Sequence, residues 1–137
     1  MIRYIPDTDH VSLHQDNHPQ VIARMKAYPP DELAITAVTV EEQTRGRLAQ
    51  IGQPGGDLSL AYDLLRATVD YFCGLTILSF GPLDQQQYQK LRLQKIRIGT
   101  LDLRIAAITL CHEAILLTRN RRDFEQVTDL QIEDWSR

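Results

Sequence analysis

The feature that most constrains the fold is an alternation along the chain between short apolar segments and longer segments of helical pattern. The apolar segments are bounded by Pro, Gly or polar residues, and we interpret them as buried strands over residues 2–5, 33–36, 75–78 and 114–118. Strands that alternate with helices are joined by crossovers into a parallel sheet covered on both faces. The sequence therefore predicts an α/β fold, a three-layer α/β/α domain around a central parallel sheet.

Helical patterns fill the intervals between these strands. The clearest helix follows Asp57, a good N-cap residue, and its apolar residues recur at spacings of three and four until the chain reaches Gly74. Further helices are expected over residues 38–51, 83–95 and 100–112, and as a pair within residues 9–28 that is interrupted near Pro19. Pro54, Gly55 and Gly56 read as a loop within the domain.

Length and composition predict a single domain over residues 1–137, since the chain has one domain's length and no linker-like segment. The two cysteines, Cys73 and Cys111, are too few for a disulfide framework, and we expect both to be buried thiols. No segment approaches the roughly 20 apolar residues of a membrane-spanning helix. The start of the chain lacks the apolar run of a secretory signal. We therefore expect a cytoplasmic protein with no membrane association.

The net charge limits how the chain could bind nucleic acid. It carries 15 basic and 18 acidic residues, a formal charge of −3, so binding would need a local basic patch or bound cations. The candidate patch lies within residues 90–104 and contains Lys90, Arg92, Lys95, Arg97 and Arg104. A solvated helix face is the simpler interpretation of such a charge run.

Acidic residues occur where the predicted strands end. Open parallel sheets bind ligands beyond the carboxyl ends of their strands, so these acids are expected to meet at one edge. They are Asp7 and Asp9 after the first strand, Glu41 and Glu42 after the second, Asp102 at the start of the last long helix, and Asp123 after the fourth strand. Carboxylates brought together repel one another unless a cation or a raised pKa relieves them. A set of oxygen ligands without Cys or His suits Mg²⁺ or Mn²⁺, which would support metal-assisted hydrolysis of a phosphodiester.

Each acid also has a local explanation. Glu42 could complete a capping box with Thr39, and Asp102 and Asp123 stand where the dipole of a helix favours an acid. The histidines His10, His14 and His18 repeat at a spacing of four. Asn17 and Pro19 interrupt the helix there, so we expect exposed helix residues rather than a zinc site.

Five segments, taken in order, resemble the PIN-domain family of the VapC toxin type. The segments are residues 4–12 (YIPDTDHVS), 35–42 (ITAVTVEE) with Gly46, 98–107 (IGTLDLRIAA), 115–124 (ILLTRNRRDF) and 130–135 (LQIEDW). The resemblance spans nearly the whole chain. It implies a Mg²⁺- or Mn²⁺-dependent endoribonuclease that is the toxin of a toxin–antitoxin pair. It also implies a cognate antitoxin protein as partner, a homodimer, and contact with operator DNA only through the antitoxin.

The resemblance assigns roles residue by residue. Asp7, Glu42 and Asp102 take the first three metal-ligand positions. The fourth lies near Asn120 and Asp123, and we favour Asp123 because the apolar Phe124 would anchor it at the sheet edge. Supporting roles fall to Asp9, which stands where Asn is the commoner residue, and to Ser12, Thr118 and Asn120. The candidate contacts to RNA phosphates are Arg104, Lys95 and Arg97.

Two alternatives remain open at this stage. Asp7-Thr8-Asp9 after a strand also resembles the motif of haloacid-dehalogenase-type phosphatases, in which Asp7 would be the nucleophile, although the downstream lysine of that family is not evident. The second alternative is a catalytically silent PIN-fold binding module that keeps the fold without turnover. The intact acids Asp7, Glu42 and Asp102 argue against it.

Overall fold

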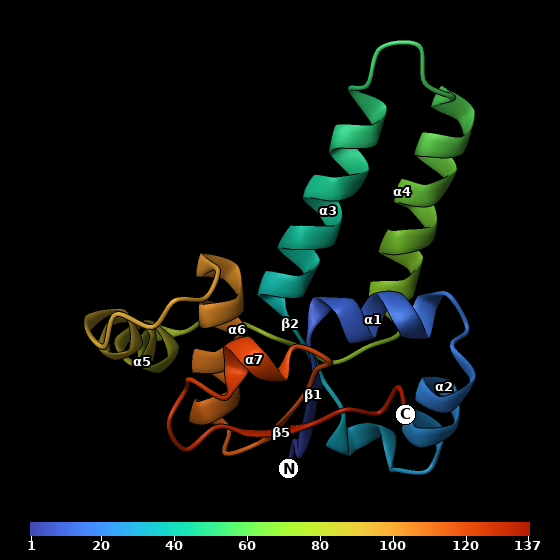
Figure 1. The fold of residues 1–137 in the computed structure, drawn as a ribbon. Coiled ribbons are helices and arrows are strands. Elements are labelled where there is room, and N and C mark those ends of the chain that lie inside the picture. The colour runs from blue at the N-terminus through green and yellow to red at the C-terminus, as the bar shows by residue number, and fades with distance from the viewer.

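The fold is a parallel β-sheet flanked by seven α-helices, described over all residues 1–137 by a computed structural model (Figure 1). Strand β1 (Tyr4–Pro6) pairs with β4 (Ile115–Leu117), which pairs with β5 (Gln131–Glu133), and β2 (Ile35–Thr36) pairs with β3 (Ile77–Leu78), all in parallel. A parallel bridge between Tyr4 and Leu33 joins the two groups, giving the strand order β3-β2-β1-β4-β5. The predicted α/β class and parallel sheet are confirmed. The order changes direction between β1 and β4, where such sheets bind ligands.

The helices follow the sequence pattern closely. They are α1 (Thr8–Gln15), α2 (Pro19–Lys26), α3 (Ala37–Ile51), α4 (Leu58–Cys73), α5 (Pro82–Leu93), α6 (Thr100–Cys111) and α7 (Arg121–Phe124), with a short 3₁₀ turn over Pro30–Glu32. Asp57 caps α4 and Gly74 ends it, as predicted. Asn17 adopts a left-handed backbone conformation, φ 61°, which separates α1 from α2. None of these helices has the length and apolar character needed to cross a membrane.

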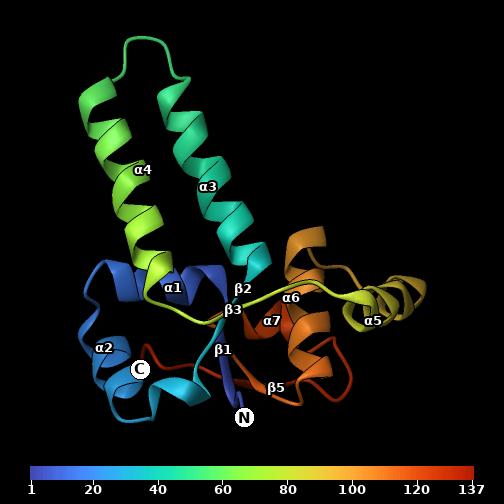
Figure 2. The ribbon, with the colours of Figure 1, turned by 180° about the vertical axis from the view of Figure 1, so that it is seen from behind.

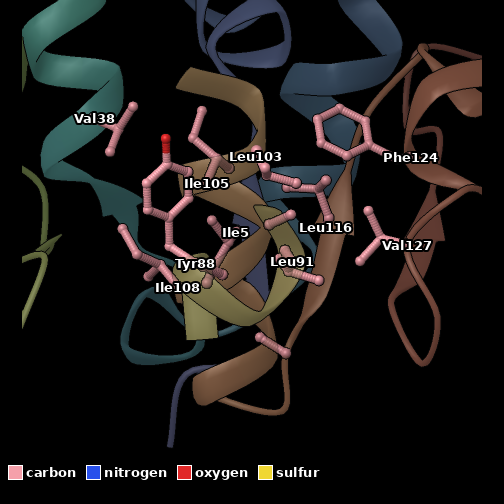
Figure 3. Packing of buried hydrophobic residues seen from close by; sticks show 13 residues of the cluster. Ile5, Val38, Tyr88, Leu91, Leu103, Ile105, Ile108, Leu116, Phe124 and Val127 are labelled. Atoms are coloured by element: carbon pink, nitrogen blue, oxygen red, sulfur yellow. The ribbon is translucent and has the colours of Figure 1, made fainter. Parts of the chain in front are cut away.

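Alternate strand residues face opposite layers of helices. Ile5 and Leu116 point into the main hydrophobic cluster, which α6 fills together with residues of α3, α5 and α7 (Figure 3). Tyr4 and Leu117 point to the other face, where they pack with the fully buried Trp135 and side chains from α2 and the segment after it. This period-two alternation buries both faces of the sheet and produces the three layers.

Helices α3 and α4 form a hairpin that projects from the sheet, as both views of the ribbon show (Figures 1 and 2). The hairpin turns through the predicted Pro54-Gly55-Gly56 loop, in which Gly55 has a φ of 72° that residues with a Cβ rarely adopt. The base of α3 lies against the sheet, so this helix connects the projecting hairpin to the edge where the acids gather.

Three local predictions were wrong or incomplete. The strand predicted over 75–78 is reduced to β3, and Ile77 is 43% exposed because β3 is the sheet edge. Strand β5 was not predicted, since its residues Gln131–Glu133 carry a single apolar side chain between two polar ones. Cys73 and Cys111 are exposed rather than buried, because each is the last residue of a helix.

Candidate functional site

Four of the six predicted acids, Asp7, Asp9, Glu42 and Asp102, converge in an open cleft of about 590 Å³ at the carboxyl ends of β1 and β4, whereas Glu41 and Asp123 do not line it. None of the residues that line this cleft is apolar: Asp7, Thr8, Asp9, Ser12, Glu42, Asp102, Arg119 and Asn120. Four separate elements of the fold supply them, so the cleft forms only when the sheet is assembled. We call it the acid cleft.

Asp7 is held where β1 passes into α1. Its backbone N–H donates to the carbonyl of Leu117 at 2.9 Å, which continues the pairing of β1 with β4 for one more residue. Its side chain caps α1, because the carboxylate oxygen Oδ1 accepts the backbone N–H of His10 at 2.8 Å. The residue is only 5% exposed. Both backbone and side chain of Asp7 are therefore fixed at the point where the strand order changes direction.

Glu42 points from the second turn of α3 toward α1. Its Oε1 accepts a hydrogen bond from the Thr8 hydroxyl at 2.7 Å. The capping-box interpretation was wrong, because the N-cap is Thr36, whose hydroxyl accepts the backbone N–H of Thr39 at 3.1 Å. Since the carboxylate of Glu42 is not used by its own helix, it is available to the cleft.

Asp102 lies in the first turn of α6, whose N-cap is Gly99. Burial, and after it the negative charges of Glu42, Asp7 and Asp123 in that order, together raise the pKa of its carboxyl group to about 6. Asp7, Glu42 and Asp102 therefore lie close enough that their negative charges repel one another, and full ionisation of all three is unfavourable. A divalent cation in the acid cleft would relieve this repulsion, and a set of carboxylate and hydroxyl oxygens fits Mg²⁺ or Mn²⁺.

Asp9 and Arg119 form a two-pronged ion pair across the cleft. The Arg119 Nε donates to one carboxylate oxygen of Asp9 at 2.7 Å and its second nitrogen donates to the other oxygen at 2.8 Å. The charge of Asp9 is therefore balanced by the protein itself. Arg119 was not among the predicted site residues. Its position two residues after β4, beside Asn120, is the signal that could have identified it.

The fourth acidic position contains a linked pair. Asn120 lines the cleft and caps α7, while its amide nitrogen donates to Asp123 Oδ2 at 2.9 Å. Asp123 does not line the cleft, yet its charge contributes to the raised pKa of Asp102. Phe124 is buried, as expected. Thr118 is buried as well, and its hydroxyl accepts the backbone N–H of Asn120 at 2.9 Å. Thr118 therefore shapes the turn rather than the cleft wall.

The predicted basic residues lie outside the acid cleft. Arg104 stacks over the ring of Tyr88 at 5.2 Å and lines a neighbouring cavity of about 480 Å³, together with Glu41 of α3. Lys95 and Arg97 are exposed in the connection between α5 and α6. Of the candidate phosphate contacts, Arg104 follows Asp102 by two residues on α6 and so points to a different side of the helix, whereas Lys95 and Arg97 belong to the surrounding surface.

The histidines are more buried than predicted. Ligand atoms of Asp7, Asp9 and His10 lie within 4.8 Å of one another, an arrangement that could hold a metal ion. However, His10 is fully buried and its Nε2 accepts the backbone N–H of Trp135 at 3.1 Å. His14 bonds the Tyr71 hydroxyl, so the expectation of exposed helix residues was wrong. The carboxylates of Asp7 and Asp9 also line the acid cleft, whereas the His10 ring does not.

A parallel sheet covered by helices on both faces, with a carboxylate cleft where the strand order changes direction, defines a PIN-type domain. No protein-family model matches the chain. Its sequence is 31% identical over 139 residues to ribonuclease VapC1 of Haemophilus influenzae strain R2866, and the alignment covers 98% of both chains. The corresponding protein of strain Rd is 30% identical over the same length. The chain therefore belongs to the VapC family of ribonucleases, toxins of VapBC toxin–antitoxin pairs.

Solved structures agree with this assignment. The VapBC-1 structure from nontypeable Haemophilus influenzae matches with a TM-score of 0.77 and 26% identity over the full length of both chains. DNA-bound VapBC from Salmonella typhimurium matches with a TM-score of 0.82, covering 98% of this chain and 99% of that one, at 20% identity, which supports the fold alone. Nothing among these relatives supports the phosphatase alternative.

Proposed function

We propose that this ribonuclease is a metal-dependent endonuclease in which Asp7, Glu42 and Asp102 hold the ion. The observation that carries the proposal is the convergence of these three carboxylates in the acid cleft, where burial and the charges of three neighbouring acids raise the pKa of Asp102. Bound Mg²⁺ or Mn²⁺ would supply positive charge to the scissile phosphate and lower the pKa of the attacking water. Asp123 would add a fourth negative charge, and Asp9, Ser12, Thr118 and Asn120 would support the site.

The chain's own residues orient the substrate in this proposal. Arg119 is the basic side chain of the acid cleft, and its ion pair with Asp9 holds the guanidinium beside the acids. A guanidinium fixed in this way can donate paired hydrogen bonds to a phosphate. Arg104, Lys95 and Arg97 would contact phosphates farther along the RNA.

Metal removal and one isosteric substitution test the proposal. Purified protein is expected to cleave RNA with Mg²⁺ or Mn²⁺, to stop in excess EDTA, and to recover when the metal is restored. Asp7→Asn should remove cleavage and growth arrest, since the amide keeps the shape but not the charge. Asp63→Asn, the same change at an exposed position of α4, is the matched control and should behave as wild type. Cleavage in excess EDTA would refute the metal mechanism, and no cleavage under any of these conditions would favour the silent binding module.

Replacing Arg119 should weaken the use of RNA without removing the metal site. We expect Arg119→Ala to lower the cleavage rate about tenfold at subsaturating RNA. The slope of the logarithm of RNA affinity against the logarithm of salt concentration should become shallower by about one, as expected for one lost phosphate contact. Arg122→Ala is the control, because Arg122 is exposed and forms no ion pair. Kinetics at several salt concentrations measure both effects. Since Arg119→Ala also leaves Asp9 unbalanced, the double variant with Asp9→Asn separates loss of the phosphate contact from added negative charge. Wild-type kinetics in that double variant would contradict a phosphate role.

Partners follow the same proposal. The similar structures include VapBC complexes, two of them bound to DNA. We infer that this chain binds a cognate antitoxin and reaches operator DNA only through it. We also infer that it is a single domain over residues 1–137 and acts as a homodimer in the cytoplasm. Co-expression with the antitoxin followed by light scattering, with and without operator DNA, tests the assembly.

A further inference from the structure

His10 is a buried residue that links the acid cleft to the C-terminal segment. It is 0% exposed, and its ring lies between Asp7 and the turn that contains Trp135. On one side, Nδ1 lies 3.5 Å from the Asp7 carboxylate oxygen Oδ1. On the other side, Nε2 accepts the backbone N–H of Trp135 at 3.1 Å. Two segments separated by 125 residues therefore meet at this one ring.

The contact with Trp135 determines where the proton of the ring must be. A nitrogen that accepts an N–H carries a lone pair, so the neutral imidazole holds its proton on Nδ1. That Nδ1–H is buried and has no hydrogen-bond partner. Buried donors are nearly always paired, and the Asp7 carboxylate oxygen that Nδ1 faces is the acceptor that could pair it.

Asp134 does not reverse this assignment. Its Oδ1 lies 3.6 Å from Nε2 and would by itself favour a proton there. That oxygen already accepts the backbone N–H of Ser136 at 2.8 Å and also the Ser136 hydroxyl. A proton on Nε2 would also point at the N–H of Trp135 and leave that amide without an acceptor. The lone pair therefore belongs on Nε2.

We propose that His10 is a positioning residue of the metal site, whose Nδ1–H orients the Asp7 carboxylate while the Trp135 backbone fixes the ring. The inference rests on the proposed function, because it takes Asp7 as a metal ligand. Carboxylates that ligate metals are themselves held by hydrogen bonds, and loss of such a partner lowers metal affinity by roughly 10–100-fold. A histidine that only fills space would leave metal affinity unchanged.

The first test uses the unmodified chain, labelled with ¹⁵N-histidine. Long-range ¹H–¹⁵N spectra distinguish the two neutral tautomers from the imidazolium. The signal of His10 is the one that persists when His14, His18 and His112 are replaced one at a time. We expect the Nδ1–H tautomer, with an Nδ1 resonance that moves when MgCl₂ is added. An Nε2–H tautomer, an imidazolium, or a resonance unaffected by saturating Mg²⁺ would overturn the proposal.

The second test divides the two contacts of the ring between two variants. His10→Asn places an amide N–H near the position of Nδ1 and loses the acceptor for Trp135, whereas His10→Gln keeps an acceptor near Nε2 and loses the donor to Asp7. Mn²⁺ affinity by calorimetry should stay within about threefold of wild type in His10→Asn. It should fall roughly 10–100-fold in His10→Gln and in His10→Leu.

Trp135 supplies an independent readout, because it is the chain's single tryptophan and its fluorescence reports docking of the C-terminal segment. We expect the opposite order here, with the wild-type spectrum retained in His10→Gln and altered in His10→Asn. If Mn²⁺ affinity is instead retained in His10→Gln and lost in His10→Asn, as the fluorescence is, then His10 has only a packing role.

One further comparison keeps the two proposals distinguishable. If Asp7→Asn abolishes Mn²⁺ binding while all His10 variants bind like wild type, only the positioning role is refuted. If wild type binds no Mn²⁺ and Asp7→Asn changes nothing, the proposed metal site fails, and the positioning role with it. Should the variants not fold, the tautomer measured in the unmodified chain decides.

Discussion

Asp102→Asn is expected to abolish RNA cleavage while stabilising the metal-free protein. The substitution removes a proposed metal ligand, and the loss of several kcal/mol of transition-state stabilisation corresponds to about a 10³-fold lower rate. It also removes a charge that the fold accommodates poorly, since burial and the charges of Glu42, Asp7 and Asp123 raise the pKa of Asp102 to about 6. Loss of function and gain of stability from one isosteric change would identify the acid cleft as a site that sacrifices stability for catalysis.

The pH dependence of stability has a definite sign. The folded pKa of Asp102, about 6, lies above its ordinary value of 3.8, so the folded state binds more protons than the unfolded state between these values. The free energy of unfolding of the metal-free protein should therefore fall as the pH rises from about 4 to about 6. The full shift corresponds to ~3 kcal/mol. Because Asp102 is partly exposed, solvent screening reduces the expected effect to ~1 kcal/mol, or about 3 °C in Tm.

Calorimetry at pH 4.5, 6 and 7.5 measures this effect, with and without Mg²⁺. Asp102→Asn should raise the Tm of the metal-free protein at pH 7.5 and reduce its pH dependence. Added Mg²⁺ should stabilise wild type more at pH 7.5 than at pH 4.5, because binding requires the ionised carboxylate. Asp84→Asn is the matched control: Asp84 occupies the same first-turn position in α5, where its carboxylate accepts the Gly81 N–H at 2.8 Å, so the variant should be less stable. A lower Tm for Asp102→Asn in the metal-free state would contradict the electrostatic interpretation.

The sequence predicted those parts of the fold that depend on local pattern. The helix between Asp57 and Gly74 was predictable because its cap, its apolar spacing and its glycine stop all agree. Strand β5 was not, since its short Gln131–Glu133 segment pairs only after β4 is in place. The strand predicted over 75–78 was overestimated, because apolar composition does not reveal that β3 would lie at the sheet edge.

The candidate site divides in the same way. Asp7 and Glu42 could be predicted to meet because each follows a strand of a parallel sheet, and Asp102 because it begins the helix that leads into β4 and so starts at the same edge. The ion pair of Asp9 with Arg119 and the contact of His10 with Trp135 could not, because each joins residues more than 100 positions apart through side-chain geometry. The helical pattern of residues 9–28 alone predicts that His10 is exposed, because it does not reveal that the C-terminal segment around Trp135 covers this side chain.

Asp123→Asn is expected to reduce cleavage by about 10²-fold and to raise the Mg²⁺ concentration needed for half-maximal rate. The residue is partly buried beside the anchored Phe124, and its charge acts on Asp102 although it does not line the acid cleft. Asparagine keeps the size of the side chain and removes only the charge. We therefore expect the variant to remain folded but to need more Mg²⁺ for cleavage, because Asp123 supplies negative charge close to the proposed ion.

Asn120→Ala provides the paired comparison, because Asn120 lines the cleft and could offer a neutral oxygen. Its amide donates to Asp123 and its side-chain oxygen accepts the backbone N–H of Asp123, so its proposed role is to hold that carboxylate. We expect a smaller loss, about tenfold, with some loss of stability from the missing N-cap of α7. Mg²⁺ titrations of cleavage, with Tm as a measure of folding, separate the two roles. A wild-type titration for Asp123→Asn beside an inactive but folded Asn120→Ala would show that the fourth ligand is the amide oxygen of Asn120. That result would leave only three carboxylates to balance the ion, and Asp123 would then be a helix-start acid.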